Sequence, residues 1–464
     1  MKKINNYLNI IEKQYIKKFP VSGTFFEEGK KYFPNRVSHA GRFLSPFPPY
    51  IKSARGPVVE TVDGEKLVDF WQGHFCNILG HNPPIITEAI ERLNKSGLGL
   101  QLGIYTGLEA ELASLLARAT GLEQFVFTTS GTLATMYSVM LGLAHAKRDK
   151  VLKIAGGWHG AHLWSLKGVK FPNGLDKVVM ESAGISDSLA FETLVTPFND
   201  CEALEECFEE HGKKIGVFIL ELVLGNSGMV VADKEFIRRS RELATKHGVI
   251  LVVDEMVTGF RVCPGGMHKF YDIEPDIVTF GKAISGGMPF ACIAGKKNIM
   301  SHVSTSKPLR VWADSGTFTS HPATLVAAKT MVQYLMDNAN VVYPKLLKNM
   351  NFVREELKRI FQQNDVLVHI TGESQNNEIP NFPISTVRFI KDNKIYDHNK
   401  ALMHWDPEAV DIVLRDRISK MFMMLEGYYT WQGLGVMTYS HTDYQIKNLL
   451  NAYKKLANEI NCTS

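Results

Sequence analysis

The segment Val249-Ile-Leu-Val-Val253 is apolar at every position and runs directly into the carboxylates Asp254 and Glu255. A continuous apolar run is typical of a parallel strand whose two faces are both covered. Ligands bind beyond the carboxyl ends of such strands, so Asp254 is expected to face a crevice. The run therefore predicts an α/β protein with a site at this strand end. A simpler interpretation is that Asp254 or Glu255 caps the following helix.

A second, largely apolar run over 277–281 ends in Lys282, and a glycine pair follows at 286 and 287. A lysine amine held at the mouth of a buried strand can form a Schiff base with an aldehyde cofactor, and neighbouring glycines allow close approach. Asp254 can keep a ring nitrogen of such a cofactor protonated, which makes the ring an electron sink. A lysine at a strand end is, however, often simply solvated.

Two further strand-like segments end in turns that suit the same ligand. Ser130, Gly131 and Thr132 precede a segment with helical spacing, which predicts a phosphate seat at a helix N-terminus. Trp158, in Gly156-Gly-Trp-His-Gly160, can stack on a planar ring, which adds roughly 1 kcal/mol beyond burial. The alternatives are an ordinary N-cap and a core tryptophan with a hydrogen-bonded histidine neighbour.

Strand-like and helical patterns alternate to about residue 296, which predicts a mainly parallel sheet. The four motifs, in this order, resemble those of the fold-type I pyridoxal 5'-phosphate (PLP) enzymes, specifically class III aminotransferases of the glutamate-1-semialdehyde aminomutase branch. The resemblance extends from residues 63–70 to residues 316–322. It implies a large PLP-binding domain over 76–325 and a smaller α+β domain formed by both chain ends, 1–75 and 326–464.

The resemblance also implies a homodimer with shared active sites, and a small amine or amino acid with a carbonyl acceptor as substrates. Lys282 and Asp254 are the expected catalytic residues, and no metal site is expected. Gly316 and Thr317 match a turn that reaches the cofactor phosphate from the neighbouring subunit, and Met256 is expected on the second ring face. The residues expected to bind the cofactor are Ser130, Gly131, Thr132, Trp158, His159, Glu221, Asn226, Asp254, Met256, Lys282, Gly316 and Thr317.

Departures from the aminomutase pattern concern the substrate. Where the aminomutases have Ser-Pro-Val-Arg, whose arginine is associated with the substrate carboxylate, this chain has Ser45-Pro-Phe-Pro48. The resemblance therefore implies an amino compound other than glutamate 1-semialdehyde, bulkier or less anionic. The residues expected to form its pocket are Phe47, His74 and Trp158, and further aromatic candidates, some of them core residues, are Trp71, Phe75, Trp312 and Trp431.

The motifs leave the reaction outcome open. Intermolecular amino transfer is the expectation, and the alternatives are an intramolecular aminomutase and an amino-acid racemase or epimerase. A relative that binds a phosphate ligand without catalysis is a further alternative, although such a protein has no use for Lys282 beside Asp254.

Composition restricts the class of partner. The chain has 464 residues with 52 Lys and Arg against 48 Asp and Glu, which gives no case for nucleic acid. Its six cysteines lack metal-ligand or disulfide spacing, which favours a reducing cytoplasm. The sequence contains no run of about eighteen apolar residues, so no membrane span is expected.

Two segments carry weaker predictions. Residues 1–10 are expected to form a surface or dimer-packing helix, since they lack the core of a signal peptide. Residues 168–184 are less regular, and Ser182-Ala-Gly-Ile185 resembles the start of a mobile loop over the aminomutase site; an exposed connection without function is the alternative.

Overall fold

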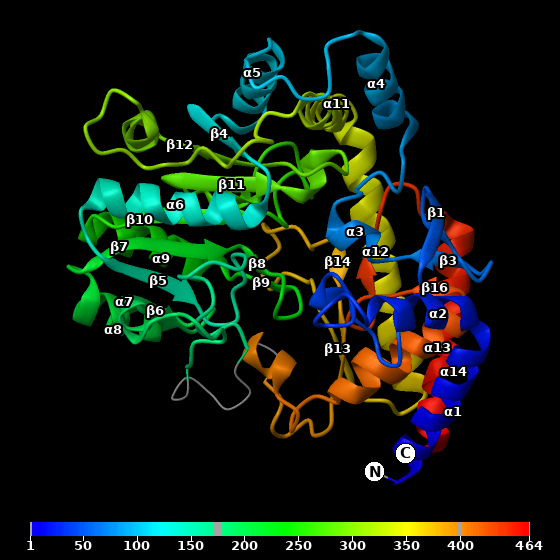
Figure 1. Ribbon diagram of the computed structural model, residues 1–464. Helices are drawn as coiled ribbons and strands as arrows, with labels where there is room; N and C mark the ends of the chain where they lie inside the picture. Colours follow the sequence, from blue (N-terminus) through cyan, green and yellow to red (C-terminus); the bar gives the residue numbers. More distant parts are fainter. Residues whose placement is uncertain (1, 171–177, 398–400, 464) are drawn as a thin grey trace.

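The computed structural model describes residues 2–170, 178–397 and 401–463. A seven-stranded sheet forms the core of the larger lobe, on the left in Figure 1. The strand order is β4-β12-β11-β10-β7-β5-β6, and only β12 runs antiparallel to its neighbours. The predicted α/β fold with a mainly parallel sheet is confirmed. The strands are β4 (Gln124–Thr128), β5 (Lys150–Ile154), β6 (Thr193–Thr196), β7 (Ile215–Glu221), β10 (Ile250–Glu255), β11 (Ile277–Gly281) and β12 (Ala291–Gly295).

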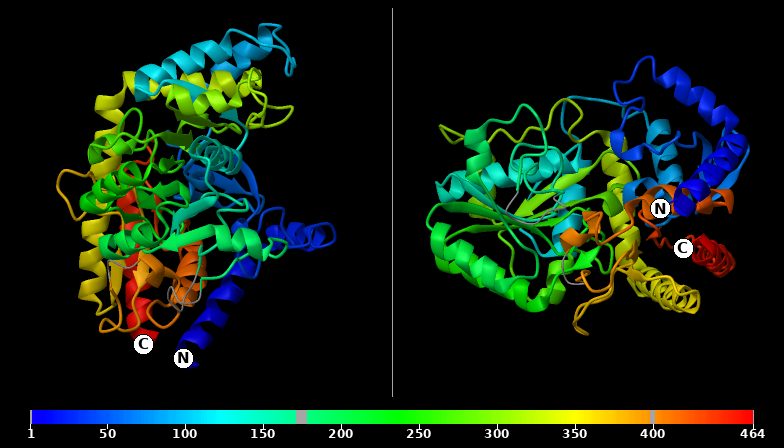
Figure 2. Two further views of the ribbon diagram at one scale, coloured as in Figure 1. Left: turned by 90° about the vertical axis from the view of Figure 1, so that its left-hand side faces the viewer. Right: turned by 90° about the horizontal axis from the view of Figure 1, so that it is seen from below.

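Helices cover both faces of this sheet, which explains why its strands are apolar without alternation. Helix α6 (Gly131–Ala146) packs on one face, while α8 (Cys201–His211) and α9 (Lys234–His247) pack on the other (Figures 1 and 2). Two successive residues of β7 show the two sides: Val217 lies in the core beneath α6, and Phe218 lies in the core beneath α9.

The two ends of the chain share a second, four-stranded sheet. Strands β1 (Ile51–Arg55), β2 (Val58–Thr61) and β3 (Lys66–Asp69) form an antiparallel meander, and β16 (Tyr428–Tyr429) pairs in parallel with β3. Helix α1 (Lys2–Lys18) packs against α13 (Ser419–Leu425) and α14 (Asp443–Thr463), so the termini lie side by side (Figures 1 and 2).

Helix α11 (Pro322–Asp337) crosses the predicted boundary at residue 325, and it is followed by the long helix α12 (Ala339–Gln363). The division at residues 75 and 325 stays a prediction. The remaining elements are α2 (Pro20–Gly29), η1 (Ala40–Arg42), α3 (Gln72–Phe75), α4 (Pro84–Lys95), α5 (Leu108–Thr120), α7 (Asp187–Glu192), β8 (Val223–Leu224), β9 (Val230–Val231), η3 (Met267–Tyr271), η4 (Lys282–Ser285), α10 (Lys297–Met300), η5 (Ser301–Val303), β13 (Val368–Ile370), β14 (Ile384–Ser385), β15 (Val387–Phe389), η6 (Ala401–Trp405), η7 (Leu414–Ile418) and β17 (Gly435–Val436).

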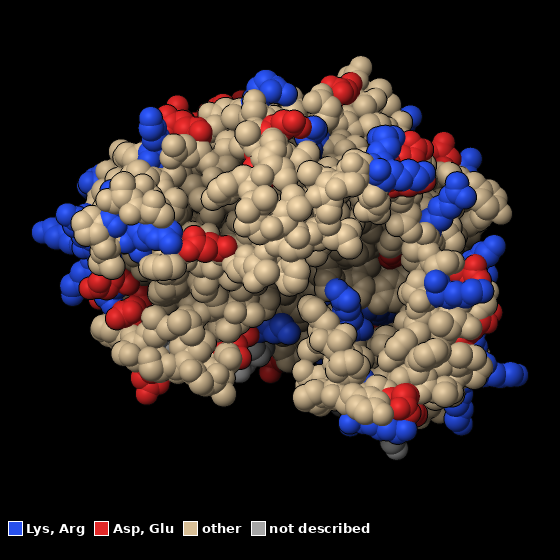
Figure 3. All heavy atoms as spheres, turned by 45° about the horizontal axis from the view of Figure 1, so that its top comes forward, with Lys and Arg blue, Asp and Glu red and all other residues tan. Residues whose placement is uncertain are grey.

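Acidic and basic side chains are interspersed over the face in Figure 3, which is hollowed between two lobes. Among the described residues no helix is long and apolar enough to cross a membrane. His, Cys, Asp and Glu side chains in the same described ranges form no group that could hold a metal ion. Of the loop predicted over 168–184, residues 171–177 lie outside the described part of the chain.

Candidate active site

Three neighbouring strands bring polar side chains into one row at their carboxyl ends. Asp254, near the end of β10, is level with Glu221 on β7 and with Thr279 on β11. All three side chains are buried. Because the strands are parallel, this row lies at the edge of the sheet where α/β proteins bind ligands.

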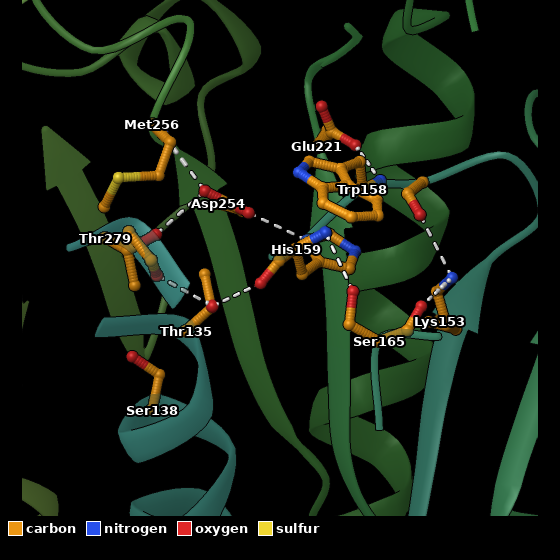
Figure 4. Close-up of polar contacts among 12 residues, drawn as sticks. Thr135, Ser138, Lys153, Trp158, His159, Ser165, Glu221, Asp254, Met256 and Thr279 are labelled. Carbon is orange, nitrogen blue, oxygen red and sulfur yellow. Dashed lines mark hydrogen bonds and ion pairs between the residues drawn. The ribbon is translucent and has the colours of Figure 1, made fainter. Parts of the chain in front are cut away.

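The Asp254 carboxylate accepts three hydrogen bonds. Its Oδ1 accepts from Thr279 Oγ1 at 2.9 Å and from the Met256 backbone N–H at 3.0 Å, and its Oδ2 accepts from His159 Nδ1 at 2.8 Å (Figure 4). Burial disfavours the charged carboxylate, but the His159 hydrogen bond and charge outweigh it, and the pKa of Asp254 lies below its usual value. The Asp254 carboxylate is therefore ionised and held in one orientation by these hydrogen bonds. It also stabilises the turn at Met256.

His159 reaches Asp254 from the loop after β5, 95 residues earlier in the chain. Its backbone N–H donates to Ser165 Oγ at 3.0 Å, and its carbonyl accepts from Thr135 Oγ1 of α6 at 2.5 Å. Its ring Nε2 is buried and has no hydrogen-bond partner among the described residues. The two backbone hydrogen bonds fix the position of His159, and its ring in turn fixes the Asp254 carboxylate.

Glu221 connects two loops at the same edge. Its Oε1 accepts from the Trp158 backbone N–H at 2.8 Å, and its Oε2 accepts from the Gly225 N–H at 3.1 Å. Burial raises the pKa of Glu221, while hydrogen bonds from these two N–H groups oppose the rise. Asp254, His159, Thr279 and Glu221 are here called the Asp254 cluster. Trp158 is 42% exposed, so one surface of its indole beside this cluster is open to a ligand.

Lys282 follows β11 immediately and begins the short turn η4. Its backbone φ is +44°, in the left-handed region that a residue with a side chain rarely adopts. A Cβ on Gly281 would lie 2.7 Å from Met256 Sδ, and one on Gly131 would lie 3.0 Å from the same sulfur. The Met256 side chain, which follows β10, therefore packs between the end of β11 and the start of α6, and the absence of a Cβ on both glycines leaves room for it.

The start of α6 suits an anion. Ser130 is its N-cap, with Oγ accepting from the Leu133 N–H at 3.3 Å, and Thr132 Oγ1 accepts from the Ala161 N–H at 3.3 Å. The first N–H groups of a helix lack intrahelical acceptors and carry the positive end of its dipole.

These groups fit PLP, which presents a phosphate, a ring nitrogen and an aldehyde. The α6 N-terminus, the ionised Asp254 and the Lys282 amine match those three in chemistry, and the buried Asn226 Nδ2 has no hydrogen-bond partner in the described part of the chain. The individual cofactor contacts stay predictions.

Of the predicted pocket residues, His74 lines a cavity of about 510 Å³ together with Trp71 and Pro48. Phe47 instead packs in the core against Tyr15, with ring centroids 5.4 Å apart. The ring of Phe75 meets that of Trp431 edge-on at 4.8 Å, also in the core. Trp312 is exposed and lies under Arg310.

Gly316 and Thr317 lie in an exposed segment, where the Thr317 carbonyl accepts a hydrogen bond from Gln101 Nε2 at 2.5 Å. The sequence did not single out Thr279 and Thr135, which hold Asp254 and His159, or Lys153, whose Nζ donates to three carbonyl oxygens of the loop after β5. Thr279 was detectable, because a hydroxyl within an otherwise apolar buried strand requires a hydrogen-bond partner.

Comparisons with known proteins agree with this geometry. The model of the family described as "Aminotransferase class-III" matches residues 42–374. The chain is 32% identical over 386 residues to a glutamate-1-semialdehyde 2,1-aminomutase of Methanosphaera stadtmanae, covering 83% of this chain and 86% of that protein.

Two solved structures have the same fold. A glutamate-1-semialdehyde aminomutase of Pseudomonas aeruginosa superimposes with a TM-score of 0.86 at 20% identity, covering 99% of both chains. A β-phenylalanine aminotransferase of Variovorax paradoxus gives a TM-score of 0.83 at 25% identity, covering 98% of this chain and 97% of that one. Because the family model spans well over half of the sequence, the chain belongs to the class-III aminotransferases, a family of PLP-dependent enzymes.

Proposed function

We propose that the protein is an aminotransferase that moves an amino group between an amino compound, other than glutamate 1-semialdehyde, and a carbonyl acceptor. The observation that carries the proposal is the ionised, triply hydrogen-bonded Asp254 at the end of β10, with Lys282 at the end of the adjacent strand β11. A ligand-binding protein without catalysis has no need of this pair.

Bound PLP supplies an electron sink for the substrate carbon that bears the amino group. Asp254 places a negative charge where the ring nitrogen must stay protonated, and His159 and Thr279 hold that carboxylate in position. Lys282 would hold the cofactor through its amine, and the same amine, when free, would take and return the proton of the substrate carbon. Trp158 would cover one face of the cofactor ring and exclude water from it.

The substrate part of the proposal is supported by the loop at 45–48. Pro48 stands where the aminomutase pattern has an arginine, and it lines the cavity that also contains His74. A bidentate arginine–carboxylate pair contributes on the order of 2 kcal/mol, so its loss at this position disfavours glutamate 1-semialdehyde.

The second candidate is an intramolecular aminomutase. It is favoured by the 32% identity to a protein that bears that name. The two reactions share every step that the Asp254 cluster and Lys282 perform, and they differ only in whether the product leaves before it is aminated again.

The test uses the purified protein loaded with PLP. It should be yellow, with a visible band that borohydride abolishes, and a panel of amines and amino acids should convert this band to that of the aminated cofactor. Carbonyl acceptors should then restore it. Efficient conversion of glutamate 1-semialdehyde to 5-aminolevulinate without an added acceptor would favour the aminomutase and contradict the proposed substrate class. A protein that binds no PLP would contradict both.

A further inference from the structure

The hairpin formed by β8 and β9 follows β7, and its tip (residues 225–228, here called the hairpin tip) carries Asn226. The side-chain Nδ2 of Asn226 is buried and has no hydrogen-bond partner among the described residues. Ser227 Oγ donates to the carbonyl oxygen of Gly156 at 2.9 Å. The hairpin tip therefore lies against the loop after β5, which contains Trp158.

A second set of contacts to the hairpin tip comes from the C-terminal part of the chain. Arg388 Nη2 donates to the Ser227 carbonyl oxygen at 2.8 Å, and Thr386 Oγ1 donates to that of Gly228 at 3.3 Å. Gly228 has a φ of +88°, and a Cβ on it would lie 2.5 Å from His404 Nδ1 and 3.0 Å from Arg388 Nη2. Figure 1 shows β8 and β9 between the seven-stranded sheet and β14.

Arg388, in β15, is an unusual residue for this position. Its side chain is fully buried, its other hydrogen bond goes to Tyr396 Oη at 2.7 Å, and no carboxylate in the described ranges forms an ion pair with it. A buried guanidinium without a carboxylate partner destabilises a fold relative to an apolar side chain of similar size. The long planar donor is therefore better explained by what it holds than by a gain in stability.

We propose that Arg388 is a positioning residue of the active site, which fixes the hairpin tip through the Ser227 carbonyl oxygen and so presents the Asn226 amide to bound PLP. The inference goes beyond the proposed reaction, because it concerns how the site holds its cofactor whichever amino compound is the substrate. The site then depends on contact between two parts of the chain, since Arg388 lies in β15 and Asn226 in the hairpin after β7.

The test measures the affinity of the cofactor-free protein for PLP by absorbance titration, without any substrate. Arg388→Met and Asn226→Ala should each weaken PLP binding by about 10-fold, because each removes the effect of one hydrogen bond. The double variant should bind PLP no more weakly than either single variant, because Arg388 acts through Asn226. Arg388→Lys should restore part of the affinity, since lysine keeps the charge and one donor.

Arg354→Met is the matched control. Arg354 of α12 is equally buried, and its guanidinium donates to the carbonyl oxygens of Thr371 and Ile384 at 3.0 and 3.4 Å, both in the C-terminal part of the chain. Its removal should lower the free energy of unfolding, measured with urea, but leave the affinity for PLP within about 2-fold of the wild type.

Additive losses in the double variant, or an equal loss of PLP affinity in Arg354→Met, would overturn the inference. Wild-type affinity in Arg388→Met would overturn it as well. If Arg388→Met does not fold, Arg388→Lys takes its place in the double variant, where the same coupling is expected.

The outcomes also separate this inference from the proposed function. If amines are turned over but the losses of PLP affinity are additive, the positioning role is wrong while the aminotransferase proposal stands. If Arg388 and Asn226 are coupled but no amine is turned over, the positioning role stands and the proposed function fails.

Discussion

At the residue scale, Lys282 occupies a backbone conformation that is unfavourable for it. Its φ of +44° costs on the order of 1 kcal/mol for a residue with a Cβ, and glycine escapes this cost. The conformation turns the chain sharply at the end of β11, so the lysine leaves the sheet directly at the row of polar side chains. Strain of this kind is concentrated at functional sites, where it orients a reactive group.

Two substitutions at this position separate chemistry from strain. Lys282→Ala and Lys282→Gly should both abolish turnover, because each removes the amine. Without cofactor, the glycine variant should have a free energy of unfolding about 1 kcal/mol above that of the alanine variant. Urea unfolding and amine turnover are the measurements. Retained turnover would refute the lysine assignment, and equal stabilities would refute the strain argument.

Asp254 is the second residue whose contribution can be isolated. Asp254→Asn keeps hydrogen-bond acceptors for Thr279 and Met256 but removes the charge, so turnover should fall by about 100-fold or more. Thr279→Val, which removes one hydrogen bond and keeps the charge, should cost roughly 10-fold. Single-turnover rates measured with one amine donor compare the two variants with the wild type. Comparable activity in Asp254→Asn and the wild type would show that the charge is not needed.

At the scale of elements, the loop after β5 is tied to its strand by a buried lysine. Lys153 lies within β5 and is fully buried, and its Nζ donates to the carbonyl oxygens of Gly157, Ser165 and Lys167 at 3.0, 2.9 and 2.7 Å. The loop that these bonds close carries Trp158 and His159 (Figure 4). The strand therefore positions the aromatic ring and the partner of Asp254 through one side chain.

This arrangement predicts a pH dependence of stability. Burial lowers the pKa of Lys153 to about 7, against the opposing charges of Glu221 and Glu181, whereas an unfolded lysine titrates near about 10.4. Between these values the unfolded chain binds more protons, so the folded state gains stability as the pH rises.

Lys153→Met lacks this contribution. The difference in unfolding free energy between wild type and variant should therefore increase in favour of the wild type by about 1.4 kcal/mol per pH unit above about pH 7. Urea unfolding of both proteins at several pH values gives the slope. A difference that is independent of pH would contradict a lowered pKa for Lys153.

At the scale of the whole molecule, one exposed apolar surface is expected to bind a second protein chain. Residues 101–105 and 313–317 lie together through the Gln101–Thr317 hydrogen bond and contribute to one cavity lining. This surface includes Tyr105, which is 94% exposed, and Ile104, which is 75% exposed. Exposed apolar groups gathered in this way are typical of protein–protein interfaces.

We predict a homodimer that buries this surface and brings Thr317 to the partner's active site. Ile104→Glu should yield a monomer with little activity, because a charge would be buried at the interface. Tyr444→Glu, at an equally exposed residue of α14, is the control and should remain dimeric. Sedimentation at the assay concentration measures both. A fully active wild-type monomer would refute the shared site.

The sequence alone determined the features that depend on local pattern. Apolar runs without alternation imply strands covered on both faces, and polar residues directly after them must lie at one edge of a parallel sheet, as Asp254 and Lys282 do. The family resemblance and the α/β fold followed from these motifs and their order.

Only the tertiary structure decided which distant side chains meet. The pairing of His159 with Asp254, the placement of Phe47 in the core and the approach of Arg42 to His74 depend on how loops pack over the sheet. A local pattern specifies an element and its buried face, because these follow from backbone geometry and neighbouring residues. Contacts between residues tens of positions apart are selected by the packing of the whole core, which no short segment encodes by itself.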